Sequence, residues 1–107
     1  MNHSEIIGWS DLQLFSTGFY AYQQQDYPMA ARHMGYILQL YPDSMLRDLV
    51  ILWLSQALYH CGDINGAARH MSTLLKEYPG KIDLHDDVDE ELIELGRIYS
   101  ESGRRGE

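Results

Sequence analysis

Residues 22–42 read YQQQDYPMAARHMGYILQLYP, and residues 59–79 read YHCGDINGAARHMSTLLKEYP. Placed one above the other without gaps, the two stretches are identical at ten of 21 positions, and both contain the run AARHM. The offset between them is 37 residues. A period of roughly 20 to 50 residues is the signature of stacked supersecondary units, each of which buries its apolar face against the next. The chain is therefore predicted to be a repeat protein.

The first copy reads as a helical hairpin. Ser10 and Gln13 form the S-x-x-Q signature of a capping box, ahead of apolar residues at helical spacing. Asp26 supplies a cap for a second helix, in which Pro28 falls in the first turn, where proline is tolerated. Pro42 ends that helix, because proline cannot continue it.

The second copy repeats this plan. Asp43 or Ser44 opens a helix that runs through Tyr59, and Gly62 then suits the left-handed turn before a helix at about residues 65–78. Acidic residues at 86, 87 and 89 start a fifth helix, because they complement its dipole. No segment alternates as a strand does, so the predicted fold class is all-α. The predicted organisation of the single domain, 1–107, is repeat one at about 11–44, repeat two at about 45–80, a connector at 80–86, a capping helix at about 87–103 and a polar tail at 104–107.

Composition limits the partners. The chain has 16 acidic residues against 8 Lys and Arg, and its formal net charge of −8 repels nucleic-acid phosphates and anionic membrane surfaces. Its longest dense apolar stretch, LVILWL at 49–54, is far shorter than the roughly 18 residues that a membrane-spanning helix needs. We therefore expect no nucleic-acid partner and no direct membrane insertion.

The compartment is less constrained. The first residues, MNHSEIIGWSD, lack a basic segment followed by an apolar one, so no export signal is visible. The compartment is therefore left open: a cytoplasmic location fits the missing signal, and a periplasmic location fits if the chain is a fragment of a longer protein. The single cysteine, Cys61, excludes an internal disulfide framework and leaves the redox compartment undecided.

The motifs of catalytic and metal sites are missing. His33 and His70 occupy equivalent repeat positions, roughly 10 Å apart by helix-packing distance, which is too far to share a zinc ion. Cys61 follows His60, but adjacent helical residues point in different directions, so no base is placed beside the thiol. The acidic run HDDVDEE at 85–91 lacks the glycine of a calcium-binding loop. We expect no catalytic residue, no metal and no cofactor, and therefore no enzyme.

The fifth predicted helix carries the clearest family motif, with Leu92, Leu95, Gly96 and Tyr99 in the order L-x2-L-G-x2-Y. It resembles the first helix of a tetratricopeptide repeat, a unit of about 34 residues with the pattern W-x2-L-G-x2-Y, then A-x3-F, then P. The departures are Leu or Ile for Trp, Met for Phe, and longer periods of 37 and 41 residues. The matching positions in the first two units are Leu14, Gly18, Ala30, Met34 and Pro42, and Ile51, Leu54, Ser55, Leu58, Ala67, Met71 and Pro79.

This resemblance implies a fold and a subgroup. Antiparallel hairpins would form a right-handed superhelical array of five helices, in which small residues at Gly18, Ser55 and Gly96 let the helices approach closely. The long period and the YPDS ending at 41–44 resemble the repeats of bacterial envelope proteins, such as outer-membrane-assembly lipoproteins and the Tol-Pal-associated periplasmic protein.

In the tetratricopeptide family the first helix of each hairpin lines a concave groove, and the resemblance implies which residues face it. Aromatic anchors concentrate binding energy at interfaces, which favours Phe19, Tyr22, Trp53 and Tyr59 as contacts. Other inward positions, such as Phe15, also fit an ordinary core. Polar groove residues would orient a ligand backbone or an acidic group. The residues assigned to partner binding are Phe15, Phe19, Tyr22, Gln23, Trp53, Gln56, Tyr59, His60 and Arg97.

The leading hypothesis is a non-enzymatic protein-interaction module that holds a peptide or partner protein in an aromatic concave groove. A second hypothesis is a self-associating structural subunit, because two and a half repeats fall short of the about three that stacked arrays need for stability. A third is an accessory domain of a bacterial envelope assembly factor. The expected partners are therefore a protein or peptide, or a second copy of the chain.

Overall fold

The computed structural model describes residues 8–80 and 88–105. These residues form five helices and no strand, which confirms the all-α class. No helix among them is both long and apolar enough to cross a bilayer. The helices are α2 (Asp11–Gln23), α3 (Tyr27–Leu40), α4 (Arg47–His60), α5 (Ile64–Glu77) and α6 (Glu90–Arg105).

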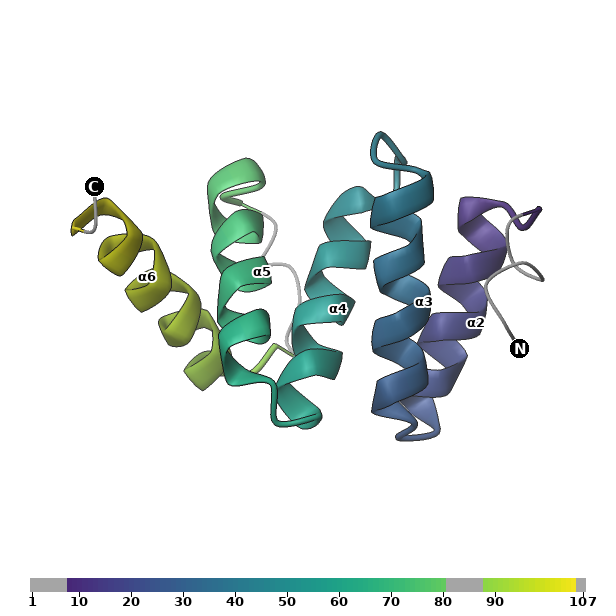
Figure 1. The fold of residues 1–107 in the computed structure, drawn as a ribbon, viewed down its shortest axis with the longest axis horizontal. Coiled ribbons are helices and arrows are strands. Elements are labelled where there is room, and N and C mark those ends of the chain that lie inside the picture. Colours follow the sequence, from purple (N-terminus) through teal and green to yellow (C-terminus); the bar gives the residue numbers. More distant parts are fainter. Residues whose placement is uncertain (1–7, 81–87, 106–107) are drawn as a thin grey trace.

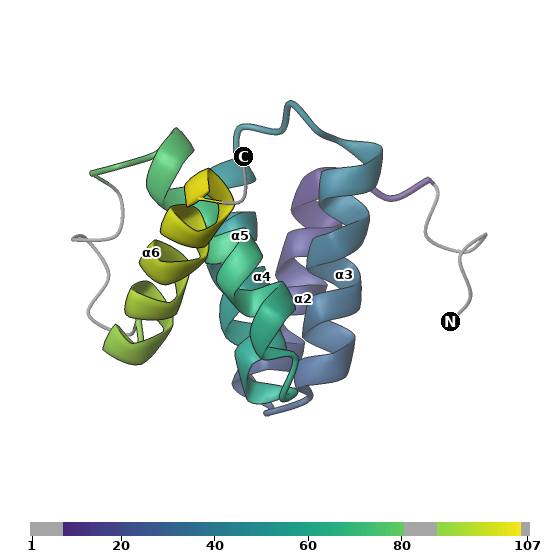
Figure 2. The same ribbon diagram turned by 60° about the vertical axis from the view of Figure 1, so that its left-hand side comes forward.

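Each helix packs mainly on its neighbours in the sequence. The extensive contacts are α2 with α3, α3 with α4, α4 with α5 and α5 with α6, whereas α2 and α4 touch only slightly. Figure 1 shows the helices side by side in chain order, and Figure 2 shows α2 and α3 as one hairpin beside the following helices. Such a quasi-linear arrangement leaves one face of α6 and one face of α2 without a neighbouring helix among the described residues.

The two hairpins begin their second helices with the same hydrogen bond. The Asp26 carboxylate accepts from the backbone N–H of Met29 at 3.3 Å, and that of Asp63 accepts from Gly66 at 3.0 Å. These caps satisfy a backbone donor that the first turn of a helix leaves free. The sequence repeat is therefore a repeat of local structure, with the predicted Asp26 cap in place.

The turns before those caps also match. Gln25 has φ 64° and Gly62 has φ 87°, so both adopt the left-handed conformation. The two positions are one repeat period apart. Glycine adopts this conformation at little cost because it has no Cβ, whereas glutamine is strained there by about 1 kcal/mol. The prediction for Gly62 is confirmed, and the first repeat tolerates a strained residue at the same place.

Two helix boundaries differ from prediction. The capping box of Ser10 and Gln13 is present, but α4 begins at Arg47 and not at Asp43 or Ser44. The Ser44 hydroxyl instead donates to the Asp11 carboxylate at 2.6 Å and accepts from the Leu46 N–H at 3.0 Å. These bonds hold a turn between the repeats. The capping helix α6 begins at Glu90 and continues into the predicted polar tail. Residues 86 and 87, part of the acidic first turn that was predicted, lie outside the described residues.

The repeated AARHM runs contribute to the core. Ala30, Ala67, Met34 and Met71 are each at most 1% exposed, as the pattern predicts. Small residues permit this packing. A Cβ on Gly18 would lie 3.0 Å from the Cβ of His33, and one on Gly96 would lie 2.6 Å from Met71 Cγ. Neighbouring helices therefore approach closely at these glycines.

Candidate functional site

Seven ring side chains form a continuous surface cluster across both hairpins. On α2 the spacing of Phe15, Phe19 and Tyr22 is i, i+4, i+7, which puts all three on one helix face. Rings from α3 and α4 complete the set. We call it the aromatic cluster, and it consists of Phe15, Phe19, Tyr22, Tyr27, Trp53, Tyr59 and His60.

Trp53 of α4 is the centre of the cluster. Its indole lies 5.1 Å from the ring of Phe19, at 65° between the planes, and 5.0 Å from the ring of Tyr22, at 63°. Edge-to-face pairs of this kind contribute about 0.5–1.5 kcal/mol each beyond the burial of their area. Trp53 therefore joins the second repeat to the first helix of the first repeat, although α2 and α4 have little other contact.

Tyr27 extends the cluster to the hairpin tips, the turns that join α2 to α3 and α4 to α5. Its ring lies edge-to-face against Tyr22 at 5.2 Å and stacks on His60 at 4.5 Å, with 18° between the planes. The sequence analysis missed Tyr27, because it assigned the groove to first helices alone. Its position in the sequence could have indicated this contact. Tyr27 is the first residue of α3, and helix side chains tilt toward the N-terminus, which here is the loop between α2 and α3.

An open cavity of about 380 Å³ lies on this cluster. Four of its six lining residues are aromatic, and the other two are glutamines at the end of α2 and in the turn before α3. None of these described lining residues carries a charge. Of the predicted set, Phe19, Tyr22, Gln23 and Trp53 meet here. The lining residues are Phe19, Tyr22, Gln23, Gln25, Tyr27 and Trp53.

Two predicted contact residues instead support the capping helix. Gln56 is 2% exposed, and its side-chain oxygen accepts from the backbone N–H of Asp89 at 3.4 Å, so it is buried against the start of α6 and does not line the aromatic cavity. Tyr59 donates a hydrogen bond to the Glu91 carboxylate, which raises the pKa of the phenol. Both side chains connect α4 to the start of α6, so Tyr59 sits at the margin of the aromatic cluster.

Arg97 lies apart from the aromatic cavity. Its guanidinium pairs with Glu94, one turn earlier on α6, at 3.6 Å, and both side chains are mostly exposed. It lines a separate hollow of about 560 Å³ together with Leu75 and Lys76 of α5. That hollow shares no lining residue with the aromatic cavity. The structure thus does not bring Arg97 together with Phe19 and Trp53.

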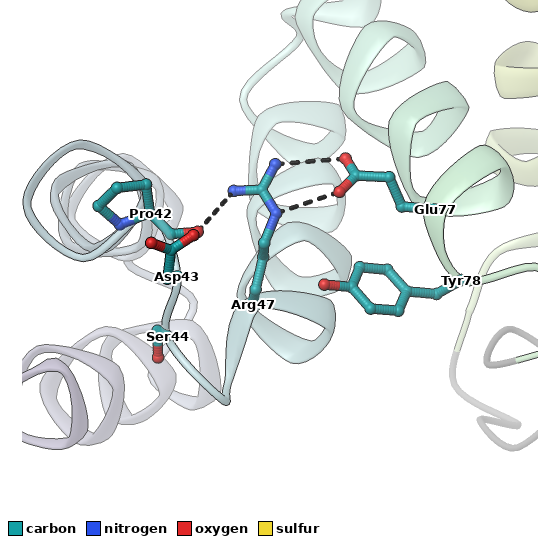
Figure 3. Close-up of a pocket in the computed structure, with 6 residues that line it drawn as sticks. All are labelled: Pro42, Asp43, Ser44, Arg47, Glu77 and Tyr78. Atoms are coloured by element: carbon teal, nitrogen blue, oxygen red, sulfur yellow. Dashed lines mark hydrogen bonds and ion pairs between the residues drawn. The ribbon is translucent and has the colours of Figure 1, made fainter.

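A further hollow, of about 550 Å³, lies where the segment after α3, the start of α4 and the end of α5 meet. It contains a structural ion pair (Figure 3). Two guanidinium nitrogens of Arg47 donate to the two carboxylate oxygens of Glu77, each at 3.2 Å, and a third donates to the Pro42 carbonyl at 3.3 Å. The hydrogen bond to Glu77 raises the pKa of Arg47. Because its donors are used within the chain, Arg47 links the start of α4 to the end of α5.

The surroundings of the cluster at the hairpin tips are acidic. Burial, followed by the charges of Asp63 and Asp26, raises the pKa of the Cys61 thiol. The exposed thiol is thereby held in its protonated, weakly nucleophilic form.

Within residues 8–80 and 88–105, no three His, Cys, Asp or Glu side chains are grouped in a way that would hold a metal ion. Comparisons of the chain with models of protein families, with characterised proteins and with solved structures find no match. The aromatic cavity is therefore the feature from which we infer a function.

Proposed function

We propose that the chain is a non-enzymatic protein-interaction module of tetratricopeptide-like architecture, which binds a peptide segment of a partner protein in the aromatic cavity. The observation that supports this is the convergence of Phe19, Tyr22, Tyr27 and Trp53, from three helices, on one open cavity. Rigid aromatic side chains lose little conformational entropy on binding and dominate the energetics of protein interfaces.

The rim of the cavity fits this role. Gln23 and Gln25 are exposed, and their amide groups offer donors and acceptors to a peptide backbone. An aromatic centre with a polar rim is the usual anatomy of a protein interface. The ring contacts already present hold the cavity in shape, so a ligand would not have to order it.

The experiment is selection of peptides on the immobilised protein, followed by affinity measurement on variants. Replacing both Trp53 and Tyr27 with alanine should weaken a selected peptide by about 30-fold or more, the usual effect of removing interface anchors. Leu12→Ala is the matched control, because Leu12 is exposed on α2 and lines another hollow. Circular dichroism checks that each variant is folded. Unchanged affinity in the double variant would remove the cavity from the proposal.

Self-association is the second candidate, and an apolar end face favours it. Ile98 is 49% exposed and Tyr99 is 41% exposed on α6, whose contacts with the other described helices are almost wholly with α5. Pairing of two α6 faces would bury both side chains and complete the array. Analytical ultracentrifugation should then show a concentration-dependent dimer that Ile98→Asp abolishes. A monomer at high concentration would count against this candidate.

A further inference from the structure

The rings of the aromatic cavity are set at steep angles to one another. Phe19 to Trp53, Trp53 to Tyr22 and Tyr22 to Tyr27 are three successive edge-to-face contacts, at 65°, 63° and 74°. The planes of these four rings are therefore steeply inclined to one another, and all four rings belong to the residues that line the cavity. The face of an aromatic ring is electron-rich, and it attracts a cation within about 6 Å of its centroid.

The polar groups of the cavity suit a cation as well. The side-chain oxygens of Gln23 and Gln25 can accept hydrogen bonds from an ammonium or guanidinium group. Among the described lining residues no Lys or Arg is present to compete for the rings. Arg97, which the sequence analysis expected to orient an acidic ligand group, lines a different hollow.

Gln25 gives an independent indication. Its backbone has φ 64°, a left-handed conformation that is strained for glutamine. At the equivalent position of the second repeat, this conformation is adopted by a glycine, Gly62. Glycine would adopt this conformation without strain, so the presence of glutamine here suggests that its side chain has a function. Gln25 is one of the residues that line the aromatic cavity, whereas the glycine at the equivalent position of the second repeat has no side chain.

The charge of the chain also favours a cationic ligand. The chain carries a formal net charge of −8, which attracts basic partners over long range. Close to the cluster, the carboxylates of Asp26 and Asp63 act on Cys61, and those of Glu91 and Asp89 act on Tyr59. These carboxylates lie near the ends of the aromatic cluster and add to the negative charge of the chain, which disfavours an acidic ligand.

We infer that the aromatic cavity receives a Lys or Arg side chain, carried by a basic segment of the partner protein. This inference rests on the proposed function and specifies the chemical class of its ligand. The ring faces attract the cation, the Gln23 and Gln25 amides bind its N–H groups, and the acidic surroundings steer the segment to the site.

The test compares two peptides that differ only in charge. The first is acetyl-Gly-Lys-Gly-Arg-Gly-amide, and the second has norleucine in place of both basic residues. Each is titrated into the isotopically labelled full chain at low ionic strength, and the two tryptophan indole N–H signals are followed by NMR. Trp53→Phe identifies the Trp53 signal. Trp9 lines a different hollow and serves as an internal control.

The cationic peptide should move the Trp53 signal saturably, leave the Trp9 signal in place and bind at least ten times more tightly than the norleucine peptide. Added salt should weaken it. The Trp53 variants lack that indole signal, so peptide binding to them is followed by the backbone N–H signals of the labelled chain. Trp53→Leu, which keeps an apolar side chain but removes the ring, should abolish binding. Trp53→Phe should retain part of it, because phenyl faces bind cations less well than indole faces.

Other outcomes separate the inference from the proposed function. Equal binding of both peptides at Trp53 would overturn the inference that the cavity selects a cationic side chain. The proposal that the cavity binds peptides would remain. Selected peptides that depend on Trp53 but contain no basic residue would have the same two consequences. A cationic peptide that leaves the Trp53 signal in place, or that binds without needing the ring, would overturn the inference. If peptide selection yields no ligand that depends on Trp53, the proposed function fails as well.

Discussion

The ring of Tyr22, in the first repeat, lies edge-to-face against the indole of Trp53, in the second, with centroids 5.0 Å apart. The pair spans α2 and α4, which have few backbone contacts and meet here mainly through ring side chains, Phe19 with Trp53 among them. It therefore contributes both to the stability of the stack and to the walls of the cavity.

A double-mutant cycle should measure that contribution. Tyr22→Leu and Trp53→Leu, made singly and together, should show a coupling of about 0.5–1.5 kcal/mol in the free energy of unfolding in urea. Tyr20→Leu provides the control, because Tyr20 is 63% exposed on the same helix and should show no coupling with Trp53. Additive effects for Tyr22 and Trp53 would mean that their contact adds nothing to stability.

Gln25→Gly should stabilise the fold and weaken binding. Glycine relieves the strain at φ 64°, which we expect to raise the free energy of unfolding by about 0.5–1 kcal/mol. The same change removes a side chain from the cavity rim, so affinity for the cationic peptide should fall severalfold. Gln24→Gly is the control, since Gln24 has φ −85° and gains nothing from glycine. A destabilised Gln25→Gly variant would contradict the strain argument.

Gly96→Ala should destabilise the docking of α6. The added Cβ would lie 2.6 Å from Met71 Cγ and 3.2 Å from the Met71 backbone carbon, so the two helices would have to separate. Overpacking of this kind costs about 1–3 kcal/mol. Gly35→Ala is the matched substitution, because a Cβ there has no neighbour within 4 Å, and it should stabilise α3 by about 0.5–1 kcal/mol. Urea unfolding that ranks the two variants in the opposite order would refute this packing.

His70 should make the fold sensitive to acid. Burial, then the charge of Arg69, lowers the pKa of its imidazole, so the folded chain resists protonation more than the unfolded chain does. Its contribution to stability is present above about pH 6.5, the pKa of an unperturbed histidine, and is lost as the pH falls toward the lower folded pKa. His70→Gln should therefore lose less stability than the parent chain between pH 7.5 and pH 5.5.

His60→Gln is the comparison for that measurement, because His60 is exposed and its ring stacks on Tyr27. The fall in the free energy of unfolding with acid should persist in this variant. If His60→Gln, and not His70→Gln, removes the acid sensitivity, the assignment to His70 is wrong.

Much of the fold was predictable, because local signals and the repeat agree. Asp26 caps α3, and Gly62 takes the left-handed turn as expected. The predicted site was harder, because a helical stripe specifies a face and not what covers it. Gln56 lies on the predicted face of α4, but the start of α6 buries it, and this contact joins residues 33 positions apart.

The two AARHM runs separate what the sequence by itself determines from what the tertiary structure decides. The sequence determines helical spacing and composition, so Ala30 and Ala67, and Met34 and Met71, take the same places in the core. The histidines between them diverge.

His33 is 2% exposed, donates to the Met29 carbonyl at 3.0 Å, and has the ring of Trp9 at 6.3 Å, whereas His70 stays partly exposed. Identical pentapeptides acquire different surroundings because neighbouring segments differ. The same dependence on distant segments assembled Tyr27, Gln25 and Trp53 into one cavity.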